Sequence, residues 1–298
     1  MKQFDGIAGR AMAGGRPTLV AASLVLASSF AWGHVTLAPG GATAASPYEA
    51  AFRVGHACKD AQATTGITVR LPEGFSLENV VPRAGWTLTV ADRQVSWQAA
   101  SAQAALPHKE RAEFVLRGRV SRPGARWFAV LQNCDQGSAD WAQVPTEALP
   151  KPEFPAARLE VLPAGVAAVQ VRGAWAGRTV AGRDTTGVFM TLSAPSGLRL
   201  LGASTPLAAT AQIEEAATGA VPLRRVQHGV DLPPRELVEL KPGGYQITLA
   251  NVKQVLAPGA VLPLTLQFQD ATGAPTSVTI EVPVVDPGSD APSAQRTH

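Results

Sequence analysis

The sequence predicts an all-β protein made of two β-sandwich domains. Apolar and polar residues alternate with a period of two over many short segments, as in half-buried strands. No segment carries a sustained apolar stripe at helical spacing. The composition is 46% hydrophobic but only 16% charged, and 298 residues leave room for two domains, each with its own core.

The first half of the chain contains a series of predicted strands separated by turn residues. Their spacing is typical of a sandwich or a barrel. Residues 91–93 are short enough to link two of these strands as a hairpin. The last strand, 127–131, is almost continuously apolar, so we expect it to lie in the middle of a sheet. The predicted strands are 66–71, 86–90, 94–97, 113–117 and 127–131.

A proline-rich break follows, because residues 145–155 contain four prolines. Proline cannot donate to a strand ladder and restricts the residue before it, so we expect a semi-rigid linker over 147–157. The first domain would then cover 34–146 and the second 158–285. Residues 286–298 are polar and are predicted to form a disordered tail. Strands expected in the second domain are 159–161, 168–171, 188–192, 237–240, 245–249 and the hairpin 262–268 with 277–285.

Residues 1–33 have the pattern of a secretory signal peptide. Lys2, Arg10 and Arg16 precede an apolar stretch, 19–30, that is too short to span a bilayer stably. Small residues at Ala31 and Gly33 suit cleavage before His34. We therefore expect a periplasmic protein without a stable membrane span, the alternative being an uncleaved membrane anchor.

Charge and motifs exclude several functions. The leader holds three basic residues and one acidic residue, so the formal charge of +3 falls to about +1 after its removal. No run of Lys or Arg remains, which argues against nucleic acid as a partner. No Ser-His-Asp, Cys-His or phosphate-loop pattern stands out, and we do not expect an enzyme.

The chain contains a single pair of cysteines, Cys58 and Cys134. In an exported protein such a pair is most simply a structural disulfide. Closing a loop of this length would stabilise the fold by roughly 4 kcal/mol in the chain-entropy description. The alternative, two thiolate metal ligands, requires a reducing compartment.

Cleavage before His34 would place a free α-amine and an imidazole on the same residue. The amine nitrogen and Nδ1 can close a six-membered chelate ring on one metal ion. Both are nitrogen donors that suit Cu(II), the divalent ion at the top of the affinity order. The alternative is that His34 is a solvated terminal histidine that binds no metal.

Several segments carry a resemblance to the YcnI-like copper-binding family. They are 34–37, 47–54, 55–58, 71–74, 82–86, 95–97 and 133–141. The resemblance implies an immunoglobulin-like β-sandwich that binds one Cu(II) ion. By matching position, it implies His34 as the chelating residue, Glu49 as the carboxylate ligand and Trp141 as the aromatic residue beside the metal.

Each of these residues also has a structural interpretation. Glu49 could be a solvent-facing strand residue, and Trp141 could belong to the core, as we expect for Trp86, Trp97 and Trp127. A second histidine near His34 would turn the site into a two-histidine brace. We expect His56 to be structural or near the surface instead, and the loop residue His108 to be solvated.

Residues 158–285 resemble the PCuAC family of periplasmic copper(I) chaperones, which implies a cupredoxin-like sandwich. The matching segments are 169–176, 187–192, 200–205, 238–245 and the terminal hairpin. That family binds Cu(I) with two His and two Met. Here those positions fall on Glu214, Leu223, Gln246 and Thr248, so the resemblance supports the fold and argues against a Cu(I) site. We expect Met190 in the core and His228 in solvent.

These features predict a periplasmic copper-binding protein that holds Cu(II) through His34 and acts in copper trafficking or buffering. Its partners would be copper and another periplasmic or membrane copper protein. The alternatives are a metal-free interaction protein and a copper oxidase or mono-oxygenase.

The first testable prediction concerns the chain terminus. Mass spectrometry of the exported protein should give the mass of a chain that begins at His34, because the small residues before it suit the signal peptidase. A chain beginning at any other residue would remove the basis for the His34 chelate.

Overall fold

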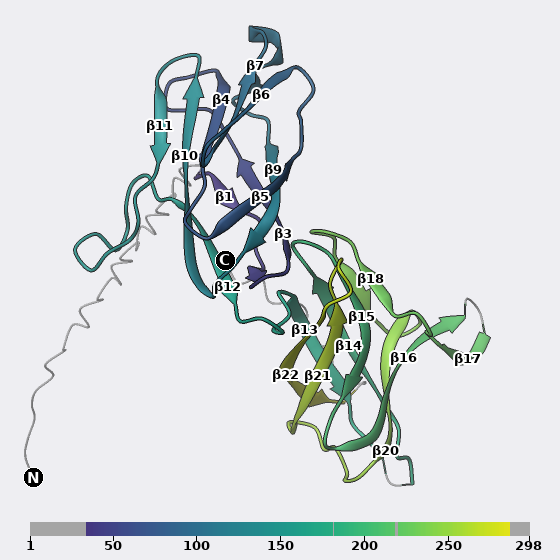
Figure 1. The fold of residues 1–298 in the computed structure, drawn as a ribbon. Coiled ribbons are helices and arrows are strands. Elements are labelled where there is room, and N and C mark those ends of the chain that lie inside the picture. Colours follow the sequence, from purple (N-terminus) through teal and green to yellow (C-terminus); the bar gives the residue numbers. More distant parts are fainter. Residues whose placement is uncertain (1–33, 181, 218–219, 287–298) are drawn as a thin grey trace, which may run out of the picture. The chain divides into compact units, whose positions relative to one another are not determined.

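The computed structural model describes residues 34–180, 182–217 and 220–286, and these form strands almost throughout (Figure 1). The predicted signal peptide and residues 287–298 of the predicted tail lie outside the described residues. From Gly33 onward the chain is one unit that contains two separate hydrophobic cores.

The first sandwich packs a four-stranded sheet against an eight-stranded sheet. The first sheet has the order β1-β3-β9-β5, and the second has the order β2-β12-β10-β4-β7-β6, with β11 on β10 and β8 on β4. Its strands are β1 (Thr36–Leu37), β2 (Ala42–Thr43), β3 (Pro47–Val54), β4 (Ala63–Arg70), β5 (Phe75–Val80), β6 (Trp86–Ala91), β7 (Gln94–Ala99), β8 (Leu106–Pro107), β9 (Ala112–Val120), β10 (Gly124–Cys134), β11 (Ser138–Trp141) and β12 (Ala157–Leu162).

All five strands predicted in this half are present. The apolar run at 127–131 lies in β10, between β12 and β4, and so in the middle of its sheet as predicted. Phe128 and Val130 are buried in the core, whereas Trp127, Ala129 and Leu131 on the other face are half-buried. Aromatic side chains join the two sheets: the rings of Phe52 and Phe128 are 5.3 Å apart, and those of Trp97 and Phe114 are 5.5 Å apart. Such edge-to-face contacts stabilise more than buried area alone.

Of the three tryptophans expected in the core, two are buried. Trp86 and Trp97 are 8% and 1% exposed. Trp127 is only half-buried, because β12 brings the guanidinium of Arg158 to 5.9 Å from its ring instead of an apolar neighbour.

The strand predicted to begin the second domain, at 159–161, completes the first one. It lies in β12, which pairs antiparallel with β10 and parallel with β2. Leu159 and Val161 are 2% and 1% exposed within the first core. The structure therefore moves the domain boundary from residue 158 to the segment after Leu162.

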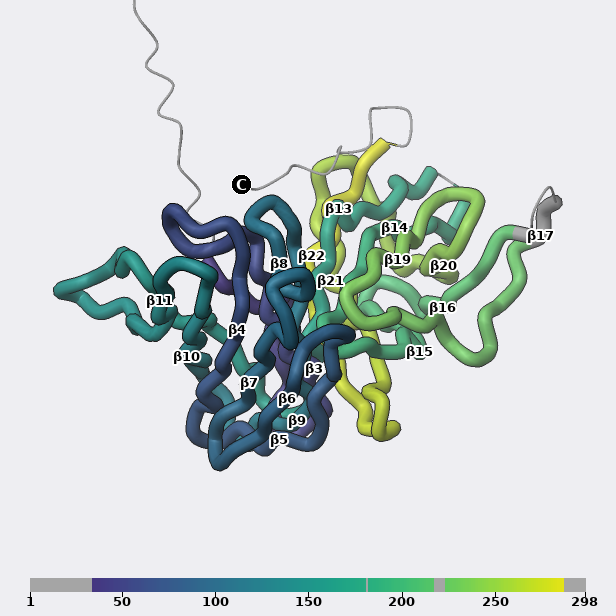
Figure 2. Tube along the Cα trace, turned by 90° about the horizontal axis from the view of Figure 1, so that it is seen from above, coloured from purple at the N-terminus to yellow at the C-terminus, as the bar shows by residue number. Residues whose placement is uncertain are grey.

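The proline-rich segment predicted as an interdomain linker is a loop of the first sandwich. It leaves β11, projects from the sheet and returns to β12 (Figures 1 and 2). The amide of Gln143 donates to Phe154 O, at 2.9 Å, and closes the loop. Composition alone indicated an extended segment, but not that its two ends meet.

The second sandwich contains ten strands in the order β17-β16-β20-β19-β14-β13-β22-β21-β15-β18, with a further pairing of β20 and β14. The terminal hairpin predicted from the sequence is present as β21 and β22. The strands are β13 (Gln170–Gly177), β14 (Thr186–Ser193), β15 (Leu198–Ser204), β16 (Ala208–Ala217), β17 (Ala220–Arg225), β18 (Val230–Leu232), β19 (Val238–Leu240), β20 (Tyr245–Val252), β21 (Val261–Gln269) and β22 (Pro275–Val285).

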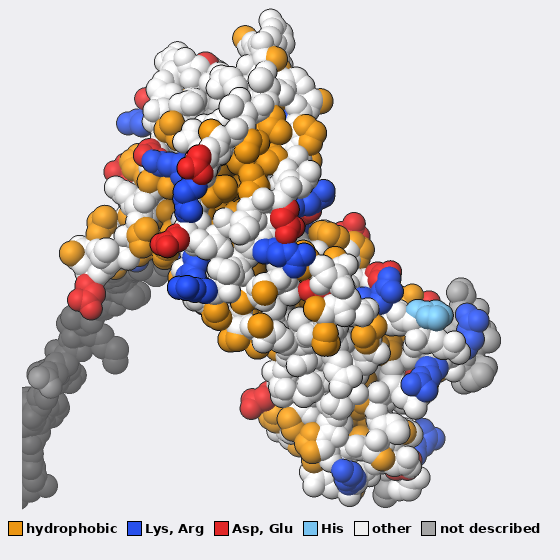
Figure 3. All heavy atoms as spheres, in the orientation of Figure 1, with side chains coloured by type: hydrophobic (Ala, Val, Ile, Leu, Met, Phe, Trp, Pro, Cys, Tyr) orange, Lys and Arg blue, Asp and Glu red, His pale blue; other side chains and the backbone are white. Residues whose placement is uncertain are grey.

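The surface carries both charges in close proximity. On the face shown in Figure 3, basic and acidic side chains are scattered and often adjacent, and no broad basic area is seen. Pairs such as Arg199 with Asp231 and Arg53 with Glu113 account for this. Over the part of the chain that the structure describes, no helix is long and apolar enough to cross a membrane.

The second prediction follows from the position of β12. A fragment covering 34–162 should fold cooperatively, whereas 34–156 should be destabilised by roughly 3–6 kcal/mol, because Leu159 and Val161 lose their burial. That loss is a large part of the stability of a typical domain. Thermal unfolding followed by circular dichroism would measure it, and equal melting temperatures would contradict the assignment of β12 to the first domain.

Candidate functional site

The structure brings His34 and Trp141 together. Their ring centroids are 5.7 Å apart in an edge-to-face arrangement, with 69° between the ring planes. The imidazole of His34 is exposed, whereas Trp141 is only 3% exposed. Phe154, from the proline-rich loop, packs against the same indole with 5.3 Å between ring centroids. The exposed imidazole of His34, which could bind a metal, therefore lies against the buried indole of Trp141.

Gln132 fixes the position of the Trp141 indole. It lies on β10 and is 1% exposed, and its Oε1 accepts the indole N–H of Trp141 at 3.0 Å. Its Nε2 donates to the backbone oxygen of His56 and to Thr64 Oγ1, each at 2.8 Å. A buried amide with these three bonds has few alternative orientations, because each lost partner would leave a polar group unsatisfied.

The predicted disulfide lies beside Gln132. Cys58 and Cys134 are joined with a Cα–Cα distance of 6.0 Å, across 76 residues of sequence. The backbone N–H of Cys58 also donates to Cys134 Sγ at 2.9 Å. The bridge ties the loop that carries His56 to the end of β10, two residues from Gln132.

Sequence analysis did not single out Gln132, although a signal was present. The alternation of buried residues along β10, from Phe128 to Val130, continues to position 132. A glutamine at an inward-facing position of a central strand indicates a buried polar connection, because burial without partners is costly.

Glu49, predicted as the carboxylate ligand, lies far from His34. Strand β1 runs antiparallel to β3, with Thr36 opposite Arg53 and Leu37 opposite Phe52, so the chain before Thr36 leads away from Glu49. Glu49 is four residues from Arg53 along β3, roughly 13 Å at the usual rise per residue, and His34 lies two residues before Thr36. The structure therefore does not bring the two predicted ligands together.

Instead, Glu49 binds two arginines. Its Oε2 accepts a hydrogen bond from Arg117 Nε at 2.8 Å, and its Oε1 is paired with Arg235 of the second sandwich. The Glu49 amide donates to Ser196 Oγ at 2.9 Å, which adds a second contact with that sandwich. Glu49 thus has a structural role at this junction, and Arg235, which sequence analysis did not single out, is its main partner.

The charge of Glu49 is maintained despite burial. Burial alone raises the pKa of this carboxyl group, but the hydrogen bonds and positive charges of Arg117 and Arg235 lower it further, so the pKa lies below its ordinary value. Each carboxylate oxygen of Glu49 thus accepts a hydrogen bond from one arginine.

Side chains alone do not form a complete metal site here. Among the described residues, no three His, Cys, Asp or Glu side chains gather closely enough to hold a metal ion. A metal bound at His34 would therefore need the α-amine that processing exposes, together with water. This donor set fits the two-nitrogen chelate expected from the sequence.

In the second sandwich, polar side chains that hydrogen-bond to one another occupy the positions where PCuAC proteins have their His and Met copper ligands. Thr248 Oγ1 donates to Glu214 Oε2 at 2.5 Å, and Gln246 Nε2 donates to Thr248 Oγ1 at 3.0 Å. Leu223 is 37% exposed, and Met190 is buried in the core at 3%. These neighbours offer neither imidazole nor thioether to a Cu(I) ion.

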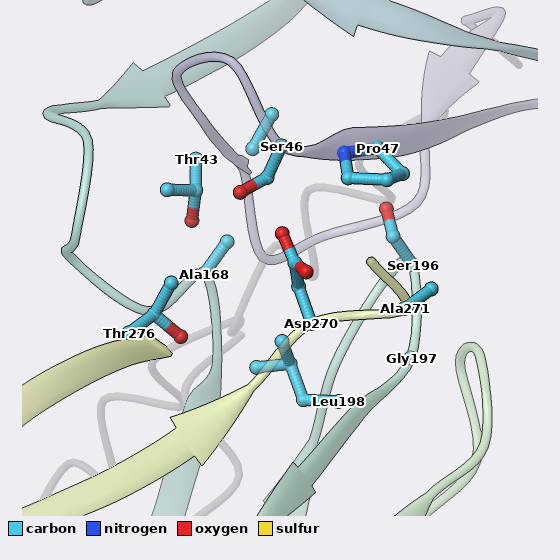
Figure 4. A pocket seen from close by; sticks show the side chains of 11 residues that line it. Thr43, Ser46, Pro47, Ala168, Ser196, Gly197, Leu198, Asp270, Ala271 and Thr276 are labelled. Carbon is cyan, nitrogen blue, oxygen red and sulfur yellow. The ribbon is translucent and has the colours of Figure 1, made fainter. Parts of the chain in front are cut away.

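A small polar cavity of about 20 Å³ lies where residues 42–47 of the first sandwich meet the second (Figure 4). The carboxylate of Asp270 points toward the side chain of Ser46, which hydrogen-bonds to it. Among the described residues Thr276 Oγ1 has no hydrogen-bond partner, and the volume suits a single water molecule that would satisfy it. This cavity is too small for an organic ligand.

Sequence comparison gives two family matches that together cover most of the described chain. Residues 34–95 and 90–161 match a domain of unknown function, DUF1775, and residues 169–284 match the putative lipoprotein LpqE-like family. A putative lipoprotein, Lxx21020, of Leifsonia xyli subsp. xyli (strain CTCB07) is 31% identical over 117 residues, which are 38% of this chain and 69% of that protein. The chain thus combines a DUF1775 domain with an LpqE-like domain. The DUF1775 match confirms the resemblance of the first domain to YcnI-like proteins and ends with β12, in agreement with the structure.

Solved structures with similarity to the chain include three single-domain proteins. An uncharacterised protein from Nocardia farcinica with an immunoglobulin-like fold is 28% identical, with a TM-score of 0.39, over 43% of this chain and 97% of that one. A copper-bound PCuAC domain from PmoF2 is 24% identical, with a TM-score of 0.33, over 40% and 93%. An apo PCuAC domain from PmoF1 is 21% identical, with a TM-score of 0.34, over 40% and 94%. PCuAC is also the family that residues 158–285 resemble in sequence.

The third prediction concerns Glu49. Because its pKa is lowered in the folded state, its contribution to stability is present above its unfolded pKa of about 4.3 and is lost as the pH falls through the folded value. Glu49→Gln should therefore lower the free energy of unfolding at pH 7 by about 1–2 kcal/mol, since Arg117 is solvent-screened.

The difference between wild type and Glu49→Gln should shrink steadily as the pH falls below about 4.3. Denaturant unfolding at several pH values would measure it. Glu239→Gln is the matched control, because Glu239 pairs with Lys241 on the exposed surface and should change stability little. A difference that does not vary with pH would contradict the ionic role of Glu49.

Proposed function

We propose that this protein is exported and binds Cu(II) at a site created by processing, where the α-amine and imidazole of His34 lie beside Trp141. The observation that carries the proposal is the contact between an exposed imidazole and an indole fixed by Gln132. The resemblance of the DUF1775 domain to YcnI-like proteins supports copper as the ion.

The chemistry of the donors favours Cu(II). Two nitrogen donors from one residue occupy adjacent positions of a tetragonal ion, and water fills the others. The indole shields one side of the site and limits access of solvent, which tunes a bound metal. Glu49 is not part of this proposal, because its carboxylate is bound to Arg117 and Arg235.

Export is supported by the leader pattern and by the similarity to a putative lipoprotein of Leifsonia xyli. Attachment of a lipid to a cysteine is not part of the proposal, because the two cysteines of this sequence are joined to each other. We place the protein in the periplasm, where an intact disulfide is expected.

The proposed role is copper trafficking or buffering, without catalysis. A ligand set open to water can release its ion to another copper protein of the periplasm or membrane. The LpqE-like domain would serve as a structural or docking module, because hydrogen-bonded Glu214, Gln246 and Thr248 occupy its predicted ligand positions. The competing hypothesis is a protein that binds no metal and acts only through interactions.

The fourth prediction tests the site by competition titration of Cu(II) into the oxidised chain that begins at His34. His34→Ala should remove the tightest bound equivalent, because it removes the imidazole of the chelate. The control is His228→Ala, which replaces an exposed histidine of the LpqE-like domain and should leave that equivalent unchanged. Acetylation of the α-amine is a second test that keeps the imidazole in place. Unchanged affinity in both modified forms would refute the proposal.

Fluorescence places the copper relative to Trp141. Cu(II) bound at His34 should quench Trp141, so Trp141→Phe should remove most of the quenching while copper remains bound. Trp175→Phe in the LpqE-like domain is the control and should leave the quenching unchanged. Quenching that survives in Trp141→Phe would show that the copper lies elsewhere.

A further inference from the structure

Two histidines outside the His34 chelate lie side by side in the DUF1775 domain. The ring centroids of His56 and His108 are 5.7 Å apart, with 37° between the ring planes. His56 is half-buried and His108 is exposed. They are 52 positions apart in sequence, so the fold, and not local spacing, brings them together.

The backbone of each residue is held by a hydrogen bond, His56 by Gln132 on β10 and His108 by Gln62, which directly precedes β4. The oxygen of His56 accepts from Gln132, which also binds Thr64, and the disulfide at Cys58 fixes the next turn of chain. The amide of His108 donates to Gln62 O at 2.8 Å. Two anchored loops therefore present one imidazole each.

The hydrogen bonding of His56 leaves a metal-binding nitrogen free. Its Nδ1 lies 2.7 Å from the backbone oxygen of Ala57. A carbonyl oxygen can only accept, so Nδ1 carries the hydrogen and the lone pair is on Nε2. A backbone acceptor on the other ring nitrogen is the usual arrangement for a metal-binding histidine, because it fixes the tautomer and the orientation of the ring.

The spacing of the two rings suits a shared ion. With a metal–nitrogen bond of about 2.0 Å, each ring centroid lies roughly 3.2 Å from the metal, so two bound rings have centroids roughly 4.5 to 6.4 Å apart, from a right angle to a linear arrangement. The observed 5.7 Å falls within this range. Rotation of the exposed His108 side chain can adjust the angle without moving the backbone.

We propose that His56 and His108 together bind one divalent transition-metal ion, with Cu(II) as the most tightly held. Imidazole nitrogens suit this ion, and water completes its coordination, because no third His, Cys, Asp or Glu joins the pair in the described chain. This site goes beyond the proposed function, since it needs neither the α-amine nor the imidazole of His34.

The two copper sites would be neighbours. Gln132 binds both the indole of Trp141, which contacts His34, and the backbone oxygen of His56. One end of the DUF1775 domain would then carry two Cu(II) ions, and the loop fixed by the disulfide would contribute to the second.

The test uses the full processed, oxidised chain in a His34→Ala background, which lacks the N-terminal chelate. Cu(II) added to this chain should bind in one equivalent, and pulsed electron paramagnetic resonance should show nitrogen coupling from two imidazoles. Addition of His108→Ala should abolish that equivalent, whereas addition of His228→Ala should leave it intact. Circular dichroism checks the fold, which the exposed position of His108 should leave undisturbed.

Two outcomes would overturn the proposal: a His34→Ala chain that binds no Cu(II), or one whose binding is unaffected by His108→Ala. The first of these is also the result that supports the His34 site. A processed chain that binds two equivalents, and keeps only the one that His108→Ala abolishes once His34 is replaced, would support both sites. A processed chain that binds a single equivalent, unaffected by His34→Ala and lost with His108→Ala, would refute the His34 proposal and support this one.

Discussion

The buried side-chain amide of Gln132 is the interaction on which this end of the DUF1775 domain depends. It joins strand β10 to Thr64 on β4, to the loop at His56 and to the indole of Trp141. Its bonds to Thr64 and Trp141 are buried, where an unmade hydrogen bond costs far more than a made one contributes. The candidate metal ligands therefore lie on a rigid base, even though the ligands themselves are exposed.

The disulfide and this amide act on the same loop in different ways. The covalent bridge between Cys58 and Cys134 limits how far the loop can move from β10 in any state of the chain. The hydrogen bonds of Gln132 choose one conformation within that limit. Function in this region can thus be separated from folding, because the exposed His34 and His108 can be changed while Gln132 and its hydrogen bonds stay intact.

A second polar centre, at Glu49, has the opposite character. It joins the two domains through Arg235 and is also bound by Arg117, so each of its oxygens has a cationic partner. Breaking such a pair leaves an uncompensated charge, so the carboxylate of Glu49 is part of what holds this junction together. The neighbouring water-sized cavity is lined by both polar residues, such as Asp270 and Ser46, and apolar ones, such as Leu198.

The sequence by itself predicted the all-β class, two sandwiches and a disulfide, whereas Trp141 beside His34 was implied by the resemblance to the YcnI-like family. Strand alternation is a property of neighbouring residues, and the terminal hairpin and the β10 core strand followed from it. It did not determine where the first domain ends, because the prolines of 145–155 suit a closed loop as well as a linker, and β12 is assigned only by its pairing with β10 and β2. Only the tertiary structure decided that Glu49 binds Arg235 and that His56 meets His108. These partners are 186 and 52 positions apart, so the path of the chain, and not any local pattern, sets which charges and which imidazoles meet.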